Sequence, residues 1–276
     1  MSYRKFVLYF IFLISAKLLF GQAGDRKIIN SYTTALLPKG KLEFRVAHRF
    51  GDLNDGWKTF YGIESATDIN IGFEYGITDK VSFGIDRTRG FGPLIKNINL
   101  TAKLKILNTD QKNPFDWMLF LSNSISTMKK SDDPEAINFF RKYMHRISTT
   151  VGSVISSDTN KRFVGQFTAG LTHRNLVKNG DINDIPFVGL AAKAKISRIT
   201  YLTGEFTLPF HKDRINQEIY QPIFGLGIEF DTNGGHFYQL FLTNSRSIQI
   251  NDMIPYHTAK LDDGEIRIGF ELTRIF

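Results

Sequence analysis

The sequence of 276 residues contains no cysteine, so disulfide bonds, thiolate metal centres and a cysteine-linked lipid anchor are all excluded. Histidine is scarce as well. None of the six histidines stands in the His-x-His or His-x-x-x-His spacing that brings two imidazoles onto one face of a strand or helix. The glycine-rich fingerprints of phosphate and dinucleotide binding are also missing. We therefore predict no metal site and no cofactor.

A further absence concerns long apolar runs, because the sequence has one near its start and none of comparable length afterwards. The run Phe6–Ala16 follows two basic residues and precedes the small residues Gly21 and Ala23, a pattern typical of a secretory signal peptide. This run is shorter than the about 20 residues that a membrane-spanning helix needs. We predict that residues 1–22 are a signal peptide, with an uncleaved anchor as the weaker alternative.

Neither sign of charge is in large excess. Without residues 1–22 the chain keeps 32 of its 35 basic residues against 27 acidic ones, and the basic residues form no dense stripe. A nucleic-acid-binding surface is therefore not expected. The chain also lacks the His-x-Ser spacing of outer-membrane phospholipases, which need both side chains on one face of a strand. We predict no catalytic residues and rank an enzyme as a distant third among the possible functions.

What the sequence does contain is alternation of apolar and polar residues. In the segments Ile69–Ile77 and Val81–Thr88, apolar side chains occupy almost every second position, and only Thr78-Asp79-Lys80 separates the two segments. A period of two over this length is incompatible with a helix, and so short a connection enforces antiparallel pairing. The two segments are predicted to form a β-hairpin with one apolar face.

The same pattern recurs along the chain and divides it into twelve segments. Short connections, such as 197–198, alternate with long ones, such as 127–145. Short periplasmic turns and long external loops are typical of outer-membrane barrels with both termini in the periplasm. We predict an all-β fold, a single antiparallel transmembrane β-barrel of about 12 strands over residues 41–276, preceded by an irregular periplasmic segment over residues 23–40. The predicted strands are 41–50, 69–77, 81–88, 96–107, 115–126, 146–156, 162–174, 185–196, 199–209, 219–231, 236–246 and 265–276.

The last predicted strand ends at the final residue, Phe276, after apolar side chains at every second position from 266 to 272. This ending is similar to the terminal strand that the outer-membrane assembly machinery of Gram-negative bacteria recognises, with Gly269, Leu272 and Phe276 as its candidate signal residues. Arg274 departs from that pattern, because its position is usually apolar. We predict the assembly machinery and outer-membrane lipid as partners, and the outer membrane of a Gram-negative bacterium as the location.

Three segments carry a resemblance to a known family: Leu37–Arg45, His48–Gly51 and Asp68–Arg87. They resemble an uncharacterised family of outer-membrane β-barrels from Bacteroidota, and the similarity extends over most of the mature chain. The resemblance implies a barrel and an outer-membrane location. It brings no settled activity and no catalytic residues, so no functional residue is transferred from it.

Charged side chains lie on the polar faces of the predicted strands, where they would point into the lumen. Basic and acidic residues are nearly balanced there. Such a lining fits a pore for small polar solutes, and it also fits a network of ion pairs that fills a narrow barrel and conducts nothing; twelve strands leave both open. The candidate lumen residues are Arg45, Arg49, Glu74, Asp86, Lys103, Lys105, Arg174, Lys193, Lys195, Glu205, Glu229, Arg267 and Glu271.

One long external loop contains the residue types favoured at a helix start, with two aspartates before Pro134 and Glu135. We predict a short helix over residues 133–144, which either folds into the lumen as a constriction or lies on the rim. The favoured function is a channel for small polar solutes across the outer membrane. The alternative is a non-conducting structural or interaction barrel with an unknown protein partner.

Overall fold

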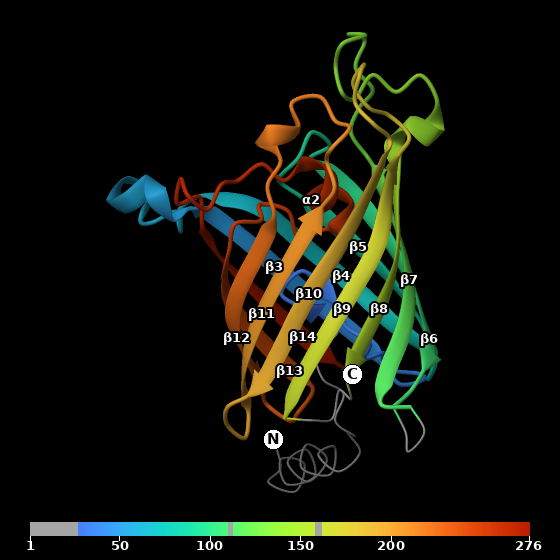
Figure 1. Cartoon of the computed structure of the whole chain (residues 1–276), viewed down its shortest axis with the longest axis vertical. Helices are drawn as coiled ribbons and strands as arrows, with labels where there is room; N and C mark the ends of the chain where they lie inside the picture. The colour runs from blue at the N-terminus through green and yellow to red at the C-terminus, as the bar shows by residue number, and fades with distance from the viewer. Residues whose placement is uncertain (1–26, 110–112, 158–161) are drawn as a thin grey trace, which may run out of the picture.

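A computed structural model describes residues 27–109, 113–157 and 162–276. Within them, strands β3 to β14 pair in sequence order and close into one antiparallel barrel, because β14 pairs with β3 (Figure 1). The predicted fold is confirmed. The strands are β3 (Leu42–Asp52), β4 (Ala66–Thr78), β5 (Val81–Arg89), β6 (Lys96–Leu107), β7 (Phe115–Ser126), β8 (Ile147–Ser157), β9 (Phe163–Arg174), β10 (Asp184–Lys195), β11 (Thr200–Pro209), β12 (Ile223–Asp231), β13 (His236–Thr243) and β14 (Arg267–Ile275).

The observed strands follow the predicted ones closely, but β12 begins four residues later than predicted and β13 ends three residues earlier. There the backbone N–H of Phe224 donates to the side-chain oxygen of Asn244, 2.9 Å away, and the Thr243 hydroxyl donates to the Phe224 carbonyl. These side-chain hydrogen bonds replace the next backbone hydrogen bonds between β12 and β13. The chain therefore leaves the barrel earlier than apolar alternation indicates.

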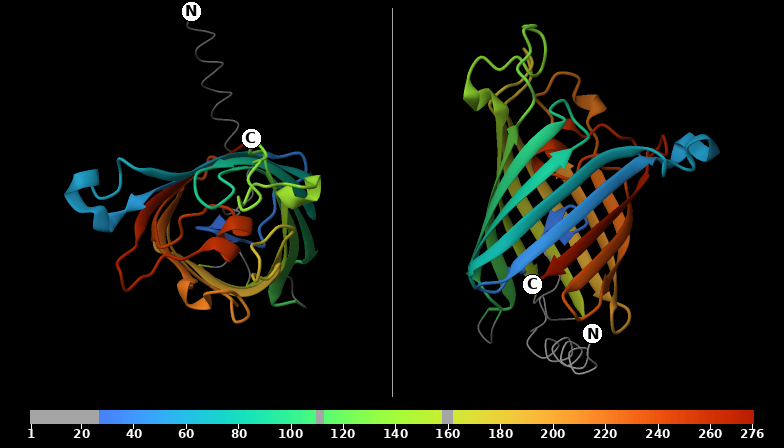
Figure 2. Two further views of the ribbon diagram at one scale, coloured as in Figure 1. Left: turned by 90° about the horizontal axis from the view of Figure 1, so that it is seen from above. Right: turned by 180° about the vertical axis from the view of Figure 1, so that it is seen from behind.

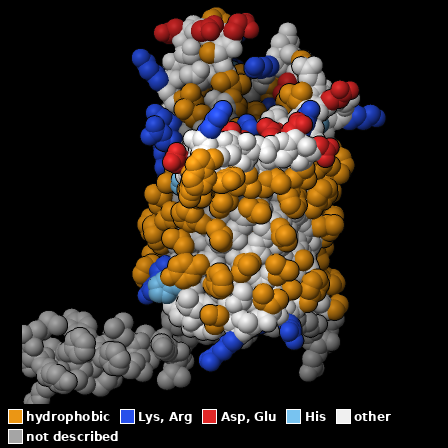
Figure 3. All heavy atoms as spheres, turned by 90° about the vertical axis from the view of Figure 1, so that its left-hand side faces the viewer, with side chains coloured by type: hydrophobic (Ala, Val, Ile, Leu, Met, Phe, Trp, Pro, Cys, Tyr) orange, Lys and Arg blue, Asp and Glu red, His pale blue; other side chains and the backbone are white. Residues whose placement is uncertain are grey.

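Successive side chains point to opposite sides of the wall, as a pleated strand requires. In β4, for example, Ile71 and Phe73 are exposed on the outside, whereas Asn70 and Glu74 are buried inside. Figure 3 shows the outcome on one face, a broad apolar belt bounded above by charged side chains. Short turns lie at the barrel end that also holds the C-terminus, and long loops lie at the opposite end (Figure 1). No helix of the described residues is both long and apolar enough to cross a membrane.

The predicted helix over residues 133–144 is wrong. This loop forms turns and a short 3₁₀ helix, η3 (Tyr143–Arg146), and rises above the long-loop end of the barrel (Figure 1). The Asp133 carboxylate accepts the Glu135 N–H at 3.0 Å, and the Asn138 side chain donates to the Lys129 carbonyl at 2.9 Å. Such local side-chain bonds favour turns over continued helix.

The N-terminal segment is also placed differently from the prediction of a periplasmic segment over residues 23–40. Its described part enters the lumen, where β1 (Lys27–Ile28) pairs with β2 (Ser31–Tyr32) in a small hairpin. We call residues 27–32 the N-terminal hairpin. Ile28 and Ile29 are each 1% exposed. Figure 2 shows this hairpin surrounded by the strands of the wall. The signal-peptide prediction over residues 1–22 lies outside the described residues.

A second insertion comes from the opposite end of the barrel. The last long loop folds inward and carries the helix α2 (Ile250–Tyr256), whose residues 250–255 are all buried. The Asn251 amide donates to the carbonyls of Ser122 and Ser148, and its oxygen accepts the Ser122 hydroxyl. Of the placements left open for residues 133–144, folding into the lumen is therefore not observed, and a different loop occupies the lumen.

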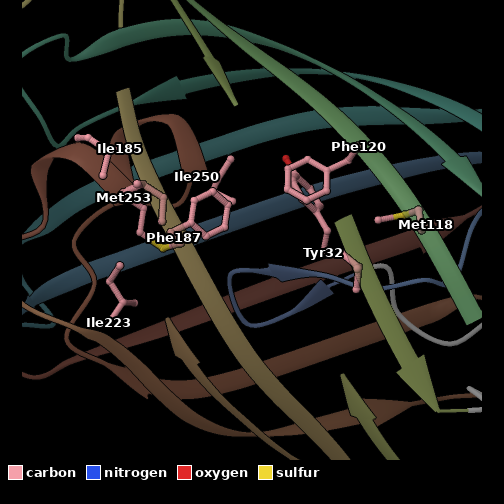
Figure 4. Close-up of a cluster of buried hydrophobic side chains, with 10 residues drawn as sticks. Tyr32, Met118, Phe120, Ile185, Phe187, Ile223, Ile250 and Met253 are labelled. Atoms are coloured by element: carbon pink, nitrogen blue, oxygen red, sulfur yellow. The ribbon is translucent and has the colours of Figure 1, made fainter. Parts of the chain in front are cut away.

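An apolar cluster inside the lumen joins the two insertions. Tyr32 of the N-terminal hairpin packs 4.9 Å from the Phe120 ring, and Met253 of α2 belongs to the same cluster (Figure 4). Inward-facing Phe187 fits because Gly170 lies opposite it: a Cβ on Gly170 would stand 2.5 Å from the Phe187 ring. The wall is thus shaped to enclose the inserted segments.

Candidate functional site: the barrel lumen

The lumen has an apolar side and a charged side. Inward-facing apolar side chains gather on β7 to β10, against α2 and the N-terminal hairpin. On β3 and β14, by contrast, the Arg45 guanidinium lies between two carboxylates, at 2.5 Å from Glu43 and 3.2 Å from Glu271. All three side chains are buried. Charge on this side is compensated locally, within the wall.

Two lysines form ion pairs that bridge an intervening strand. Lys103 on β6 reaches past β5 to Glu74 on β4, with 2.7 Å between Nζ and Oε2. Lys193 on β10 pairs in the same way with Glu229 on β12. Both pairs therefore run along the wall, so they leave the centre of the barrel free for inserted segments.

The N-terminal hairpin is attached to the wall mainly through side chains. Glu205 on β11 accepts the backbone N–H groups of Asn30 and Ser31, each at 3.0 Å, and the Ser31 hydroxyl at 2.8 Å. Gln239 on β13 accepts the Ile29 N–H at 3.1 Å and donates to the Lys27 carbonyl at 2.9 Å. One carboxylate and one amide therefore satisfy most of the polar backbone at the turn.

The turn itself adopts an unfavourable conformation. Ile29 has a φ of 58°, which is rare for a β-branched residue. Its side chain fits against Gly225, where a Cβ would stand 2.9 Å from the Ile29 Cδ1 atom. The wall thus provides both polar partners and space for this turn.

Arg49, another candidate lumen residue, lies fully buried beside the N-terminal hairpin. Its guanidinium donates to the Asn30 side-chain oxygen at 2.6 Å and lies 4.4 Å from the centre of the Phe241 ring. A Cβ on Gly269 would stand 2.4 Å from that ring. Gly269, predicted as part of an assembly signal, therefore also has a local packing role.

Other candidates lie nearer the short-turn end. Lys105 donates to the Thr34 carbonyl at 2.8 Å and pairs with Asp116 at 3.1 Å, so it also holds the N-terminal segment. Lys195 is half-buried, with its ammonium 5.3 Å from the centre of the Tyr201 ring. These lysines line the wall where the inserted segment begins.

One cavity borders the N-terminal hairpin on its charged side, and it is small. Asp86, Arg45 and Glu74 contribute to a cavity of about 20 Å³, together with Lys27 and Tyr32. This volume has room for about one water molecule. In this conformation the middle of the lumen is narrow.

Two candidates lie at the long-loop end. Arg267 is fully buried and pairs with Asp52, which also receives Arg246 at 3.1 Å. Arg174 pairs with Asp181 at 3.0 Å. The thirteen candidates therefore do not form one site: they are spread from one end of the lumen to the other.

The sequence analysis missed the residues that lock the long loops over the lumen. Arg214 contacts Asp181 through two bonds of 2.7 and 2.8 Å, lies 3.6 Å from the centre of the Tyr220 ring, and donates to the Pro255 carbonyl at the end of α2. Burial acts to raise the Asp181 pKa, but bonds from Arg214 and the charge of Arg174 lower it to about 2. No periodic pattern marks these loop residues, so they could not be predicted from the sequence.

A carboxyl group on α2 is buried with little compensation. Asp252 accepts a bond of 2.9 Å from the Asn97 amide. Burial and the nearby charge of Asp68 raise the Asp252 pKa to about 8. The described residues bring together no group of three or more His, Asp or Glu side chains able to hold a metal ion.

The terminal residues lie on the outer wall and at its edge. Leu272 is exposed on the lipid-facing side. Phe276 is 57% exposed, its backbone N–H donates to the Leu42 carbonyl at 2.8 Å, and Arg274 lies over its ring. Backbone bonding to β3 therefore continues to the final residue, Phe276, whose aromatic ring is exposed.

Solved structures of similar shape include outer-membrane channels. The chain is similar to the NanC porin, with a TM-score of 0.52, 7% identity, and coverage of 85% of this chain and 98% of that one. It is also similar to the COG4313 outer membrane channel from Pseudomonas putida F1, with a TM-score of 0.52, 13% identity, and coverage of 93% of this chain and 100% of that one. The KdgM porin is a third similar structure, with a TM-score of 0.51, 3% identity, and coverage of 86% of this chain and 98% of that one. At these identities the likeness shows the fold alone.

No curated protein sequence matches the chain. Residues 24–276, however, match the family described as "Membrane bound beta barrel domain (DUF5777)". This match covers the whole barrel and the N-terminal hairpin, and it confirms the predicted membership of an uncharacterised barrel family. The chain therefore belongs to this family of membrane-bound β-barrels.

Proposed function

We propose that the protein is an outer-membrane channel for small polar solutes, narrowed by the N-terminal hairpin and α2. The observation that carries the proposal is how these two segments are held. Neither belongs to the barrel sheet, and both are attached through side-chain bonds such as those of Glu205 and Asn251. The wall closes without them, so a path along its polar side exists once either segment shifts.

The proposed outer-membrane location is supported by the family match and by the apolar outer surface of the barrel wall. An apolar belt on a closed barrel suits a lipid bilayer, and single-chain barrels of this kind are typical of the bacterial outer membrane. The short-turn end would face the periplasm, and export would depend on residues 1–22. A Gram-negative host, of the Bacteroidota, is part of the same proposal.

One observation favours the alternative of a non-conducting barrel. Arg49, Lys103 and Arg267 are each at most 1% exposed, so the lumen in this conformation is packed. Loops or a helix plug the lumen of some outer-membrane barrels, and similarity to porins supports conduction here. An enzyme is not favoured, because the serine hydroxyls that bond Glu205 and Glu74 belong to the contacts that hold the N-terminal hairpin and the wall, and no serine hydroxyl bonds a histidine ring in the sites described above.

The proposal is tested by conductance of the full mature chain, refolded and inserted into planar bilayers. We expect small, discrete conductance steps, and proteoliposomes that admit small sugars and exclude oligosaccharides. Refolding is checked by the shift in electrophoretic mobility between heated and unheated samples. If no ions or sugars pass, either in this protein or after removal of the N-terminal hairpin, the barrel is a structural or interaction subunit.

Assembly offers a separate prediction. We propose that Phe276, with Leu272 and Gly269, is read by the outer-membrane assembly machinery, because its ring lies outside the barrel at the end of the closing strand. Deleting Phe276 should lower the amount of inserted protein several-fold in cells, whereas Phe276→Trp should preserve it. Equal amounts of the deleted and intact proteins in the outer membrane would contradict this role.

A further inference from the structure

The connection between β3 and β4 differs from the other long loops in its direction. Residues 51–65, here called the rim hairpin, project sideways from the barrel at the height where the wall strands end (Figures 1 and 2). The hairpin continues the two strands outward, with the Gly51 N–H donating to the Gly62 carbonyl at 2.9 Å. It therefore reaches beyond the wall and away from the lumen.

The tip of the rim hairpin presents large apolar side chains to its surroundings. Trp57 is 74% exposed, and Phe60, Tyr61 and Ile63 are between 41% and 49% exposed. The Trp57 ring lies 5.3 Å from Phe60 and 6.1 Å from Tyr61, both in edge-to-face contact. An aromatic cluster of this size is unfavourable in water and indicates a partner.

The cluster is held in one conformation. Phe60 and Tyr61 have φ angles of 49° and 54°, which aromatic residues seldom adopt. The Tyr61 N–H donates to the Gly56 carbonyl at 2.7 Å, and the Phe60 N–H donates to the Trp57 carbonyl at 3.2 Å. Strained positions of this kind persist where the surrounding structure enforces them. The rings are therefore presented as a fixed surface.

The base of the rim hairpin is anchored to the neighbouring loop. The Leu53 N–H donates to the Ile266 carbonyl at 2.8 Å, and the Asn54 amide donates to the Asp263 carbonyl. The Asp52 carboxylate forms ion pairs with Arg246 and Arg267. The sideways direction is thus fixed by contacts to the barrel.

The aromatic tip is continuous with the lipid-facing wall. Below it, outward-facing Phe50 packs 5.9 Å from Phe270, and Ile69 and Ile71 are exposed on the next strand. Figure 3 shows that the apolar belt extends upward to a charged rim, which marks the level where a membrane surface would lie. Tryptophan and tyrosine favour that level, because each combines an apolar ring with a polar group.

We propose that the rim hairpin is a lipid anchor, with Trp57, Phe60 and Tyr61 lying in the interfacial layer of the external leaflet. The partner of the aromatic cluster is the lipid that surrounds the barrel. Contact between the rim hairpin and lipid beyond the barrel wall would fix the rotation and tilt of the barrel. It would also hold the part of the rim next to β3 and β4 at the membrane surface. The inference does not depend on conduction, since a closed barrel would use the same anchor.

The sequence contains two tryptophans, Trp57 and Trp117, which makes a direct test possible. The variant Trp117→Phe leaves Trp57 as the only indole, and Trp57→Phe leaves Trp117, which lies on the wall and donates to the Ser153 hydroxyl at 2.8 Å. Each refolded protein is placed in vesicles whose lipids carry bromine at a shallow or a deep acyl position. Aqueous iodide serves as the opposing quencher.

We expect Trp57 to be quenched by shallow bromine more than by deep bromine, and only weakly by iodide. Trp117, near the short-turn end of β7, supplies the reference for an outward-facing indole of the wall. In a second variant, Gly62→Ala in the Trp117→Phe protein, a Cβ would stand 2.4 Å from the Gly51 carbonyl oxygen at φ +81°. That change should shift Trp57 toward iodide quenching. Strong iodide quenching of unaltered Trp57 without bromine quenching would overturn the proposal, as would protection of Trp57 from both quenchers.

Discussion

Deleting residues 27–36 should raise the single-channel conductance several-fold and make it steady. The N-terminal hairpin fills the middle of the lumen, where the cavity left beside it has room for about one water molecule. Removing it takes out no barrel strand, because β1 and β2 pair only with each other. The wall should therefore still close, around a wider path.

Because a deletion also leaves Glu205 and Arg49 without their hairpin partners, a point variant gives an independent measurement. Glu205→Ala removes the acceptor of two backbone N–H groups and of the Ser31 hydroxyl. The N-terminal hairpin should then leave its position intermittently. Brief events of large conductance should therefore appear between the small conductance steps. The full deletion should convert these brief openings into a constant state.

Glu74→Gln is the matched control for loss of a lumen carboxylate. Glu74 contacts Ser82 and Lys103 and is separate from the Glu205 contacts to the hairpin turn. The variant leaves the buried Lys103 ammonium without its counter-charge, so it should lower the stability of the barrel and alter ion selectivity, but it should not produce large openings. If the intact chain and the deletion variant both conduct and their conductances are equal, the N-terminal hairpin does not narrow the path, and the constriction is assigned to α2.

The wall of this barrel was predictable because membrane strands obey a simple rule. Lipid outside and polar contents inside impose apolar–polar alternation, and β6 and β7 were predicted with their observed bounds. The inward direction of Arg45 and Glu271 follows from the same period of two. Alternation along the sequence was therefore enough to predict the order of the strands and which side chains point into the lumen.

The contents of the lumen followed no such rule. Residues 27–32 are too few to show periodicity, and their burial depends on Glu205 and Gln239, which lie more than 170 positions away in the sequence. Apolar Phe120 and Phe187 interrupt the polar face, a signal that something apolar would cover them, and α2 and Tyr32 do so. Helix-start residues at 132–135, by contrast, predicted a helix in the wrong loop. Long-range side-chain contacts decided where the insertions lie.

The most destabilising single substitution among the lumen residues should be Lys103→Met. Lys103 is 1% exposed, bonds Glu74 at 2.7 Å, and has its ammonium 5.0 Å from the centre of the Tyr32 ring. Without it the buried Glu74 carboxylate keeps the Ser82 hydroxyl but loses its counter-charge. Breaking a buried pair from one side typically costs about 3–5 kcal/mol. Urea unfolding of the protein in lipid vesicles should show a loss of this order.

The double variant Lys103→Met with Glu74→Gln should recover most of that stability. Glutamine still accepts the Ser82 hydroxyl, and no uncompensated charge remains in the wall. Arg246→Met is the control, because Arg246 and its carboxylate partners are each 21% to 30% exposed, and such pairs contribute at most about 1 kcal/mol. Equal unfolding midpoints for Lys103→Met and the intact chain would mean that water screens this pair, and the middle of the lumen would then be open rather than packed.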